Sequence, residues 1–286
     1  MTFTEKLIVS KLDEKVRLSD LNISLFKTIA SKKALKKAIK NKRLFINNQQ
    51  GFSGDYLYGG EVIEVIEDPN SKNKPIYKLK VEVLYEDAYF AVVKKPAGLS
   101  TSGNQFQNLE NCLPFNLSAS LEEDALIRPL VIHRLDFATS GIVIIGKTQS
   151  ATINLNKQFE SRAVIKNYLA VTLNKMESPI ALTLPIDGKN AQSNITILKT
   201  LISDKYNFIN LVNINPITGR RHQIRKHLAS IGHPICGDNI YNKKEKDIRG
   251  NGLYLHALSI SFLHPETNER ISFKTEMPKK FKRLFH

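Results

Sequence analysis

The chain has no tryptophan and only two cysteines, Cys112 and Cys236, in 286 residues. Neither cysteine belongs to a CxxC pair, so the sequence predicts reduced thiols and a cytoplasmic location. No apolar run approaches the about 20 residues that span a bilayer, and the first six residues lack the apolar core of a signal peptide. We therefore expect a cytoplasmic protein with no membrane partner.

Several functional motifs are also missing. The sequence has no phosphate-loop motif, no dinucleotide-binding GxGxxG and no GxSxG turn of a serine hydrolase. His222 and His227 are five residues apart, not the four that place two ligands on one helical face, and no cysteine or carboxylate neighbours them at ligand spacing. We expect neither a metal nor a cofactor.

Acidic residues are scarce relative to basic ones. The chain has 42 lysines and arginines against 27 aspartates and glutamates, which gives a formal net charge of +15. Such an excess favours a polyanionic partner, because contacts to phosphates release counterions and attract the protein over a distance. The composition therefore indicates a protein that meets nucleic acid.

The first region, residues 1–67, has the pattern of a small α/β domain. Apolar residues at helical spacing predict a helix over residues 18–29, and Ser31 can cap a second helix over Lys32–Lys40. Leu44–Asn47 and Glu61–Ile66 have the composition of short strands around a glycine-rich turn.

The second predicted helix carries an unusual charge pattern. Between Ser31 and Arg43 there are seven basic residues and no acidic one. A solvated helix face usually mixes charges of both signs, so contact with phosphates explains this face better than hydration alone, although a merely hydrated lysine face is the alternative. The residues that we expect to contact phosphates are Lys33, Lys36, Lys37 and Lys40.

A polar, proline-bounded stretch, Asp68–Pro75, indicates a linker, which we place at residues 68–80. Residues 81–286 then form a larger domain in which strands alternate with few helices. This order predicts an α+β fold with a mixed, largely antiparallel sheet. The expected strands are 77–84, 90–93, 142–145, 168–173, 208–214, 253–262 and 270–273, with a helix over 152–162.

Chemistry is indicated first in Val131–Gly141. This segment places Asp136 beside His133 and Arg134, directly before the β-branched run Ile142–Ile145, which has the pattern of a buried strand. A carboxylate flanked by cations at the end of a buried strand is typical of an active site, but a salt-bridged loop that leads into a core strand has the same pattern.

A second segment, Ile217–Leu228, is rich in arginine. Gly219 can supply the positive φ of a turn, after which a helix is expected to carry Arg221 and Arg225 on one face, with His222 beside them. Together with Arg220 and Lys226, this segment and the positive end of its helix suit a phosphate or a carboxylate.

Taken in order, these segments resemble the RluA-type family of RNA pseudouridine synthases. The similarity runs from about Val83 to Pro265, and the first region resembles an S4-type RNA-binding domain in which Lys42-Arg43 replaces the usual glycine. After Gly98 the chain lacks the family's His-Pro pair. The motifs are Lys95-Pro96-x-Gly98, His133-Arg134-Leu135-Asp136-x-x-Thr139-Ser140-Gly141, Tyr168-x-Ala170-Val171, Thr218-Gly219-Arg220-x-His222-Gln223-Ile224-Arg225-x-His227 and Leu255-His256-Ala257.

The resemblance implies the pseudouridine synthase fold and the isomerisation of uridine to pseudouridine in structured RNA, without metal or cofactor. It implies that Asp136 is the catalytic aspartate, that Tyr168 stacks on the flipped base and assists proton removal, and that Arg225 pairs with the aspartate. Leu255 would line the pocket, and His133 would serve only the loop. The expected RNA contacts are Arg134, which would fill the gap left by the flipped base, and Arg220, Arg221 and His222.

Ribosomal RNA of the large subunit is the favoured substrate, with transfer RNA as the other, and we expect a monomer. The alternative function is a non-catalytic RNA-binding protein or ribosome assembly factor that has kept the fold. A glycoside hydrolase would need paired carboxylates or a metal, which the motifs do not provide.

Overall fold

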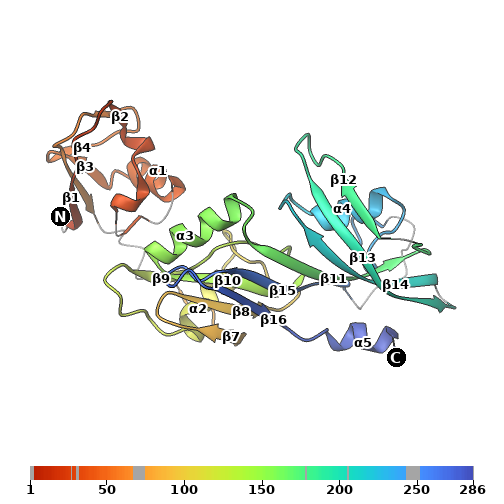
Figure 1. The fold of residues 1–286 in the computed structure, drawn as a ribbon. Helices are drawn as coiled ribbons and strands as arrows, with labels where there is room; N and C mark the ends of the chain where they lie inside the picture. Colours follow the sequence, from red (N-terminus) through yellow and green to blue (C-terminus); the bar gives the residue numbers. More distant parts are fainter. Residues whose placement is uncertain are drawn as a thin grey trace.

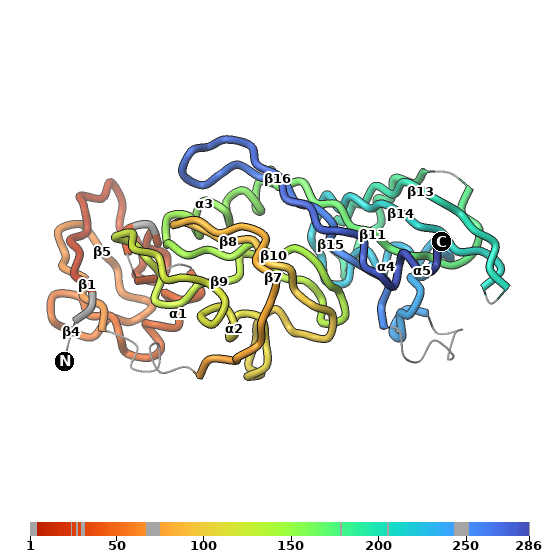
Figure 2. The backbone as a smooth tube through the Cα atoms, turned by 90° about the horizontal axis from the view of Figure 1, so that it is seen from below, coloured from red at the N-terminus to blue at the C-terminus, as the bar shows by residue number. Residues whose placement is uncertain are grey.

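The computed structural model describes residues 3–26, 28–29, 32–66, 75–177, 179–204, 206–242 and 252–285. Ser31, the expected helix cap, and residues 68–74 of the expected linker lie outside these ranges. The N-terminal residues form a small unit at one end of an elongated molecule, next to helix α3 (Gln149–Glu160) (Figures 1 and 2). No helix in the described ranges is long and apolar enough to cross a bilayer.

The N-terminal unit is built around a four-stranded antiparallel sheet with its own core. The strand order is β1-β6-β3-β4, and helix α1 (Lys32–Lys40) buries Leu35, Ala38 and Ile39 against the unit's other apolar side chains. The strands are β1 (Phe3–Ile8), β3 (Leu44–Ile46), β4 (Gln49–Gln50) and β6 (Val62–Ile66), with β2 (Val16–Arg17) paired to β5 (Tyr56–Leu57). The two strands and the lysine-rich helix expected from the sequence are therefore present.

The prediction of a helix over residues 18–29 is wrong. The chain forms two short 3-10 turns there, η1 (Leu18–Asp20) and η2 (Ile23–Leu25). Asp20 and Asn22 interrupt the apolar pattern, and such short polar side chains compete with helical hydrogen bonding. The apolar spacing still indicated burial correctly, because Leu18 and Phe26 are in the core of the unit.

The larger part of the chain forms a ten-stranded mixed sheet with few helices, which confirms the expected fold class. The path is β12-β13-β14-β11-β15-β10-β8-β7, with β16 on β15 and β9 on β10. Among the strand pairs of the described residues, only β10–β15 is parallel. The strands are β7 (Glu82–Glu86), β8 (Phe90–Lys95), β9 (Ala125–Val131), β10 (Ser140–Thr148), β11 (Ile165–Leu173), β12 (Ile180–Thr183), β13 (Gln192–Ser203), β14 (Asn207–Pro216), β15 (Leu255–Leu263) and β16 (Arg270–Lys274), and the helices are α2 (Leu109–Asn116), α3, α4 (Gln223–Ser230) and α5 (Lys279–Phe285).

The first expected strand of this sheet starts later than predicted. Residues 77–81 run along α2 instead, where the backbone N–H of Tyr77 donates to the carbonyl of Asn111 and that of Val81 to the side chain of Asn116. The sequence also gave no indication of α2 or β9, since each contains a proline, Pro114 and Pro129, that disfavours helix and strand interiors.

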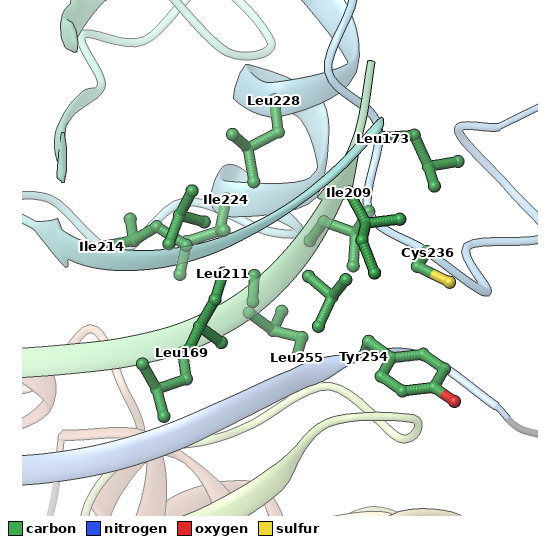
Figure 3. Packing of buried hydrophobic residues seen from close by; sticks show 14 of the residues in the cluster. Leu169, Leu173, Ile209, Leu211, Ile214, Ile224, Leu228, Cys236, Tyr254 and Leu255 are labelled. Carbon is green, nitrogen blue, oxygen red and sulfur yellow. The ribbon is translucent and has the colours of Figure 1, made fainter. Parts of the chain in front are cut away.

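Helix α4 is seated firmly on the sheet. Its Ile224 and Leu228 point toward β14 and β11, where they pack among Leu211, Ile214 and other buried side chains (Figure 3). A fully buried leucine or isoleucine stabilises the fold by about 1.5–3 kcal/mol relative to an exposed one. The packing of the apolar face of α4 therefore fixes the position of the side chains on its polar face.

The single parallel pair needs a glycine. Gly141 lies opposite Ala257 with φ of +122°, and a Cβ built there would be 2.6 Å from the amide nitrogen of Ala257. In the same place, His256 Nδ1 is 2.8 Å from Ser140 Oγ and its Nε2 is 2.8 Å from Thr275 Oγ1. Burial lowers the pKa of His256 to about 4, so a neutral imidazole joins β10 to β15.

We predict that Gly141→Ala lowers the free energy of unfolding by about 2–4 kcal/mol, because it adds a backbone clash to the strain of a positive φ. Urea denaturation measures the loss. Gly188→Ala is the matched control, since Gly188 has φ of +71° with no atom within 4 Å of its Cβ position. That variant should lose only about 1 kcal/mol from backbone strain. Equal losses for the two variants would contradict the close approach of β10 and β15.

Candidate active site

A cavity of about 770 Å³ opens where the loop between β9 and β10, the strand β11 and the turn before α4 meet. Eight of the residues expected from the sequence line it: Arg134, Asp136, Tyr168, Arg220, Arg221, His222, Arg225 and Leu255. The four lysines expected to contact RNA do not line it; they are exposed on α1 in the N-terminal unit.

The loop that carries Asp136 is held on both sides by hydrogen bonds. Thr101 Oγ1 donates to the carbonyl of Leu135 at 2.8 Å and accepts from its backbone N–H at 3.1 Å. The N–H of Thr139 donates to the carbonyl of Asp136 at 3.0 Å, and that of Gly98 to the carbonyl of Phe137 at 2.8 Å. The backbone around the carboxylate is therefore fixed.

Lys95 supports the same loop from below. Its fully buried ammonium group donates to the carbonyls of Pro96 at 2.9 Å, Leu99 at 2.7 Å and Phe137 at 3.4 Å. Burial lowers the pKa of Lys95 to about 8, although the negative charge of Asp136 acts in the opposite direction. The sequence indicated Lys95 only as part of the Lys95-Pro96-x-Gly98 motif, and its buried role was missed.

Two carboxylates lie at different distances from the guanidinium of Arg225. Its Nε and Nη2 donate to Asp238 Oδ2 and Oδ1, each at 2.8 Å, while its Nη1 is 3.6 Å from Asp136 Oδ2. Burial alone would raise the pKa of Asp238, but the guanidinium and the backbone N–H groups of Ile240 and Tyr241 bring it below its usual value. Asp238 therefore fixes the plane of the guanidinium and leaves one corner for Asp136.

His222 is the second group beside the carboxylate. Its Nε2 is 3.7 Å from Asp136 Oδ1, and its Nδ1 is 2.9 Å from the hydroxyl of Tyr241. Burial lowers the pKa of His222, with Asp136 acting in the opposite direction. The Arg225 guanidinium lies 5.1 Å from the centre of the Tyr241 ring, so this tyrosine supports both neighbours of Asp136.

The turn before α4 differs from the one expected. The positive φ belongs to His222, at 55°, and not to Gly219, and the helix begins at Gln223, so Arg221 does not share a helical face with Arg225. The side chain of Gln223 closes the turn by accepting from Thr218 Oγ1 at 2.6 Å and from the N–H of Arg220 at 3.0 Å. The turn presents His222 and the helix presents Arg225.

Tyr168 and Leu255 enter the cavity from adjacent strands, β11 and β15. Burial raises the pKa of the Tyr168 phenol well above its usual range, and the negative charge of Asp136 raises it further. The phenol is therefore protonated at neutral pH. Its hydroxyl makes no hydrogen bond to another residue of the described ranges, so it is available to a ligand.

The cavity wall on the side of α3 is aromatic and positively charged. His133 stacks on Phe159 with ring centres 4.8 Å apart, and its Nε2 accepts from the N–H of Ile144 at 3.1 Å. Burial lowers the pKa of His133 to about 3, with a smaller contribution from Lys166, so the imidazole is neutral. Lys166, 5.7 Å from the centre of the Phe159 ring, pairs with no carboxylate among the described residues. No sequence pattern indicated this lysine.

The two histidines considered for zinc are separated in the fold. His227 is buried, with Nδ1 3.1 Å from Ser193 Oγ and Nε2 2.9 Å from the carbonyl of Leu184, whereas His222 faces Asp136. Within the part of the chain that the structure describes, no three histidine, cysteine or acidic side chains gather as metal ligands would.

Comparison with known proteins agrees with this arrangement. The RNA pseudouridylate synthase family matches residues 89–230, a range that contains Asp136, Tyr168 and Arg225. The ribosomal large subunit pseudouridine synthase C of Buchnera aphidicola subsp. Schizaphis graminum is 34% identical over 226 residues, which cover 70% of this chain and 68% of that protein. The ribosomal large subunit pseudouridine synthase D of Nitrosomonas europaea is 28% identical over 274 residues, which cover 87% and 77%.

The fold is also shared with a solved structure, human RNA pseudouridylate synthase domain containing 1. The two have a TM-score of 0.57 and 22% identity, and the similarity covers 74% of this chain and 86% of that chain. The family match, the identity to its members and the common fold lead to one conclusion. The chain belongs to the RluA-type family of RNA pseudouridine synthases.

Proposed function

We propose that this enzyme converts a uridine of large-subunit ribosomal RNA to pseudouridine, with Asp136 as the catalytic carboxylate. The observation that carries the proposal is the position of Asp136 in the cavity, 3.6 Å from Arg225 and 3.7 Å from His222. The names of the two relatives favour ribosomal RNA of the large subunit over transfer RNA.

The reaction needs little besides a carboxylate and a closed pocket. The bond between C1′ of the ribose and N1 of the uracil breaks, a bond between C1′ and C5 forms, and the hydrogen of C5 is lost while N1 gains one. No electron is exchanged with another molecule. The ionised carboxylate of Asp136, next to a permanent cation, can attack C1′ or remove a proton from the sugar.

The target base must first leave its stack, because the carboxylate is in a cavity that a paired base cannot enter. Flipping a base costs a few kcal/mol, and protein contacts in the pocket and in the vacated place repay this cost. Arg134, exposed at the rim two residues before Asp136, is our candidate for the vacated place. Arg220, Arg221 and Lys166 also line the cavity and can meet the phosphates of the flipped nucleotide and its neighbours.

Tyr168 is better suited to holding the uracil than to removing a proton as a phenolate. Burial and the charge of Asp136 keep its phenol protonated. An aromatic ring can stack on the face of a uracil however the base is rotated within its own plane. Leu255 from the neighbouring strand adds apolar surface. We propose that these two residues hold the plane of the free uracil after the C1′–N1 bond has broken, while the base rotates until C5 faces C1′.

We predict that Asp136→Asn lowers the rate of pseudouridine formation by about 1,000-fold or more while RNA affinity changes by less than about threefold, because the variant keeps its shape but loses the nucleophile or base. Pseudouridine mapping of total RNA from cells with and without the gene first identifies the target, and purified variants are then assayed on it. Asp187→Asn is the control, since Asp187 is exposed and pairs with Lys226 outside the cavity lining. Full activity of Asp136→Asn would show that Asp136 is not the catalytic carboxylate. RNA binding without pseudouridine formation by the wild type would instead favour the non-catalytic alternative.

We predict that Asp238→Asn lowers kcat by about 10- to 100-fold with little change in KM, because a guanidinium that loses its bidentate partner no longer holds Asp136 in place. Asp238 acts through Arg225, so it is a positioning residue. Single-turnover kinetics at saturating RNA measure the effect, and thermal unfolding identifies any loss of fold. An unchanged kcat would show that Asp136 does not need the oriented guanidinium.

We further predict that changing Lys33, Lys36, Lys37 and Lys40 together to glutamine weakens RNA binding. The decrease of log K with log salt should become less steep, by up to about 3–4 in the slope. Chemistry at saturating RNA should be unaffected, because these lysines do not line the cavity. Neutralising Lys279, Lys282 and Arg283 on α5, at the opposite end of the molecule, is the control (Figure 2). An unchanged salt slope would remove α1 from the RNA-binding surface.

A further inference from the structure

Phe137 is an apolar ring in an unexpected place. It directly follows Asp136, lines the cavity and has 60% of its surface exposed. The other phenylalanine of the cavity wall, Phe159, stacks on His133. Phe137 has no ring partner among the described residues. An exposed phenyl ring contributes little to folding, and because this one lines a cationic cavity, its free face is open to a ligand that enters there.

The backbone around this ring cannot easily fold it away. The carbonyl of Phe137 accepts hydrogen bonds from the N–H of Gly98 at 2.8 Å and from the buried ammonium of Lys95 at 3.4 Å. The turn is closed by the bond from the N–H of Thr139 to the carbonyl of Asp136. The hydrogen bonds that fix the backbone at Asp136 therefore also fix the backbone from which the Phe137 ring projects.

We propose that the phenyl ring of Phe137 stacks on the RNA base next to the uridine that enters the cavity. The inference rests on the function proposed above. When a base flips out, the base beside it loses a stacking partner and exposes an apolar face. Phe137 follows the carboxylate that must reach the flipped sugar and lines the same cavity, so we place its ring beside that vacancy. Base faces are the planar apolar groups that an RNA strand offers to an aromatic side chain.

This role differs from that of Arg134. The guanidinium carries charge and can pair with a phosphate as well as stack, whereas the phenyl ring offers only an apolar face. The cations that line the cavity supply the contacts to phosphates. Phe137 is therefore a positioning residue: it holds the RNA strand beside the cavity and takes no part in breaking the glycosidic bond.

The first test compares Phe137→Ala and Phe137→Tyr on a short stem-loop that contains a uridine modified by the wild type. Loss of one base-stacking contact should lower kcat/KM by roughly 5- to 100-fold for the alanine variant, mainly through KM. The tyrosine variant keeps an aromatic face and should stay within about twofold of the wild type. Phe115→Ala is the control, since Phe115 is 43% exposed on α2 and lies outside the cavity lining. Because the ring is exposed, the thermal midpoint of Phe137→Ala should equal that of the wild type.

The second test removes the proposed partner instead of the ring. Two further stem-loops carry an abasic nucleotide on the 5′ or the 3′ side of the target. On the RNA that lacks the stacked base, the wild type and Phe137→Ala should have equal kcat/KM, while on the other the penalty should persist. A penalty that stays unchanged on both abasic RNAs, or a Phe137→Ala variant that matches the wild type on the intact RNA, would overturn the inference. Wild-type protein that forms no pseudouridine in any RNA would instead overturn the function proposed above, and the inference with it.

Discussion

A guanidinium can hold a neighbouring carboxylate in one position only if another group has fixed its plane, and Asp238 does this for Arg225. The pair is buried, and its two bonds of 2.8 Å leave Nη1 directed at Asp136. A buried charge without a partner would cost several kcal/mol, so neither member can be removed without disturbing the other. Asp136, the Tyr241 ring and His222 surround this pair, since Arg225 contacts the first two and the hydroxyl of Tyr241 contacts His222.

The sheet supplies the frame in which this pair meets Asp136. Strands β10, β11 and β15 are adjacent, so the loop before β10, Tyr168 on β11 and Leu255 on β15 reach one cavity although they are far apart in the sequence. Helix α4 packs its apolar face on β11 and β14 (Figure 3), and its Arg225 lines the same cavity. Packing, and not the loops alone, therefore sets the distances on which the proposed chemistry depends.

Two clusters of positive charge bear on RNA binding. One set of cations lines the cavity, and the other covers the exposed face of α1 in a unit with its own core. The unit contacts the start of α3, where Gln149 Nε2 donates to the carbonyl of Phe26. If α1 binds RNA as we propose, the bound RNA would extend from this unit to the cavity. The distance between α1 and the cavity would then limit which uridines can enter.

The sequence by itself determined the lysine-rich helix, most strands of the mixed sheet, and the motifs that contain Asp136, Tyr168, Arg225 and Leu255, because these depend on local periodicity and on residue types at fixed spacing. At residues 18–29 the apolar periodicity predicted a helix that does not form, because polar residues interrupt it. The apolar residues of the segment are buried all the same. Only the tertiary structure decided that Asp238 orients Arg225 from 13 positions away and that Lys95 supports the Asp136 loop from 42 positions away. Such contacts depend on how the strands and helices pack, which no local pattern records, and the same packing leaves the ring of Phe137 exposed beside the carboxylate.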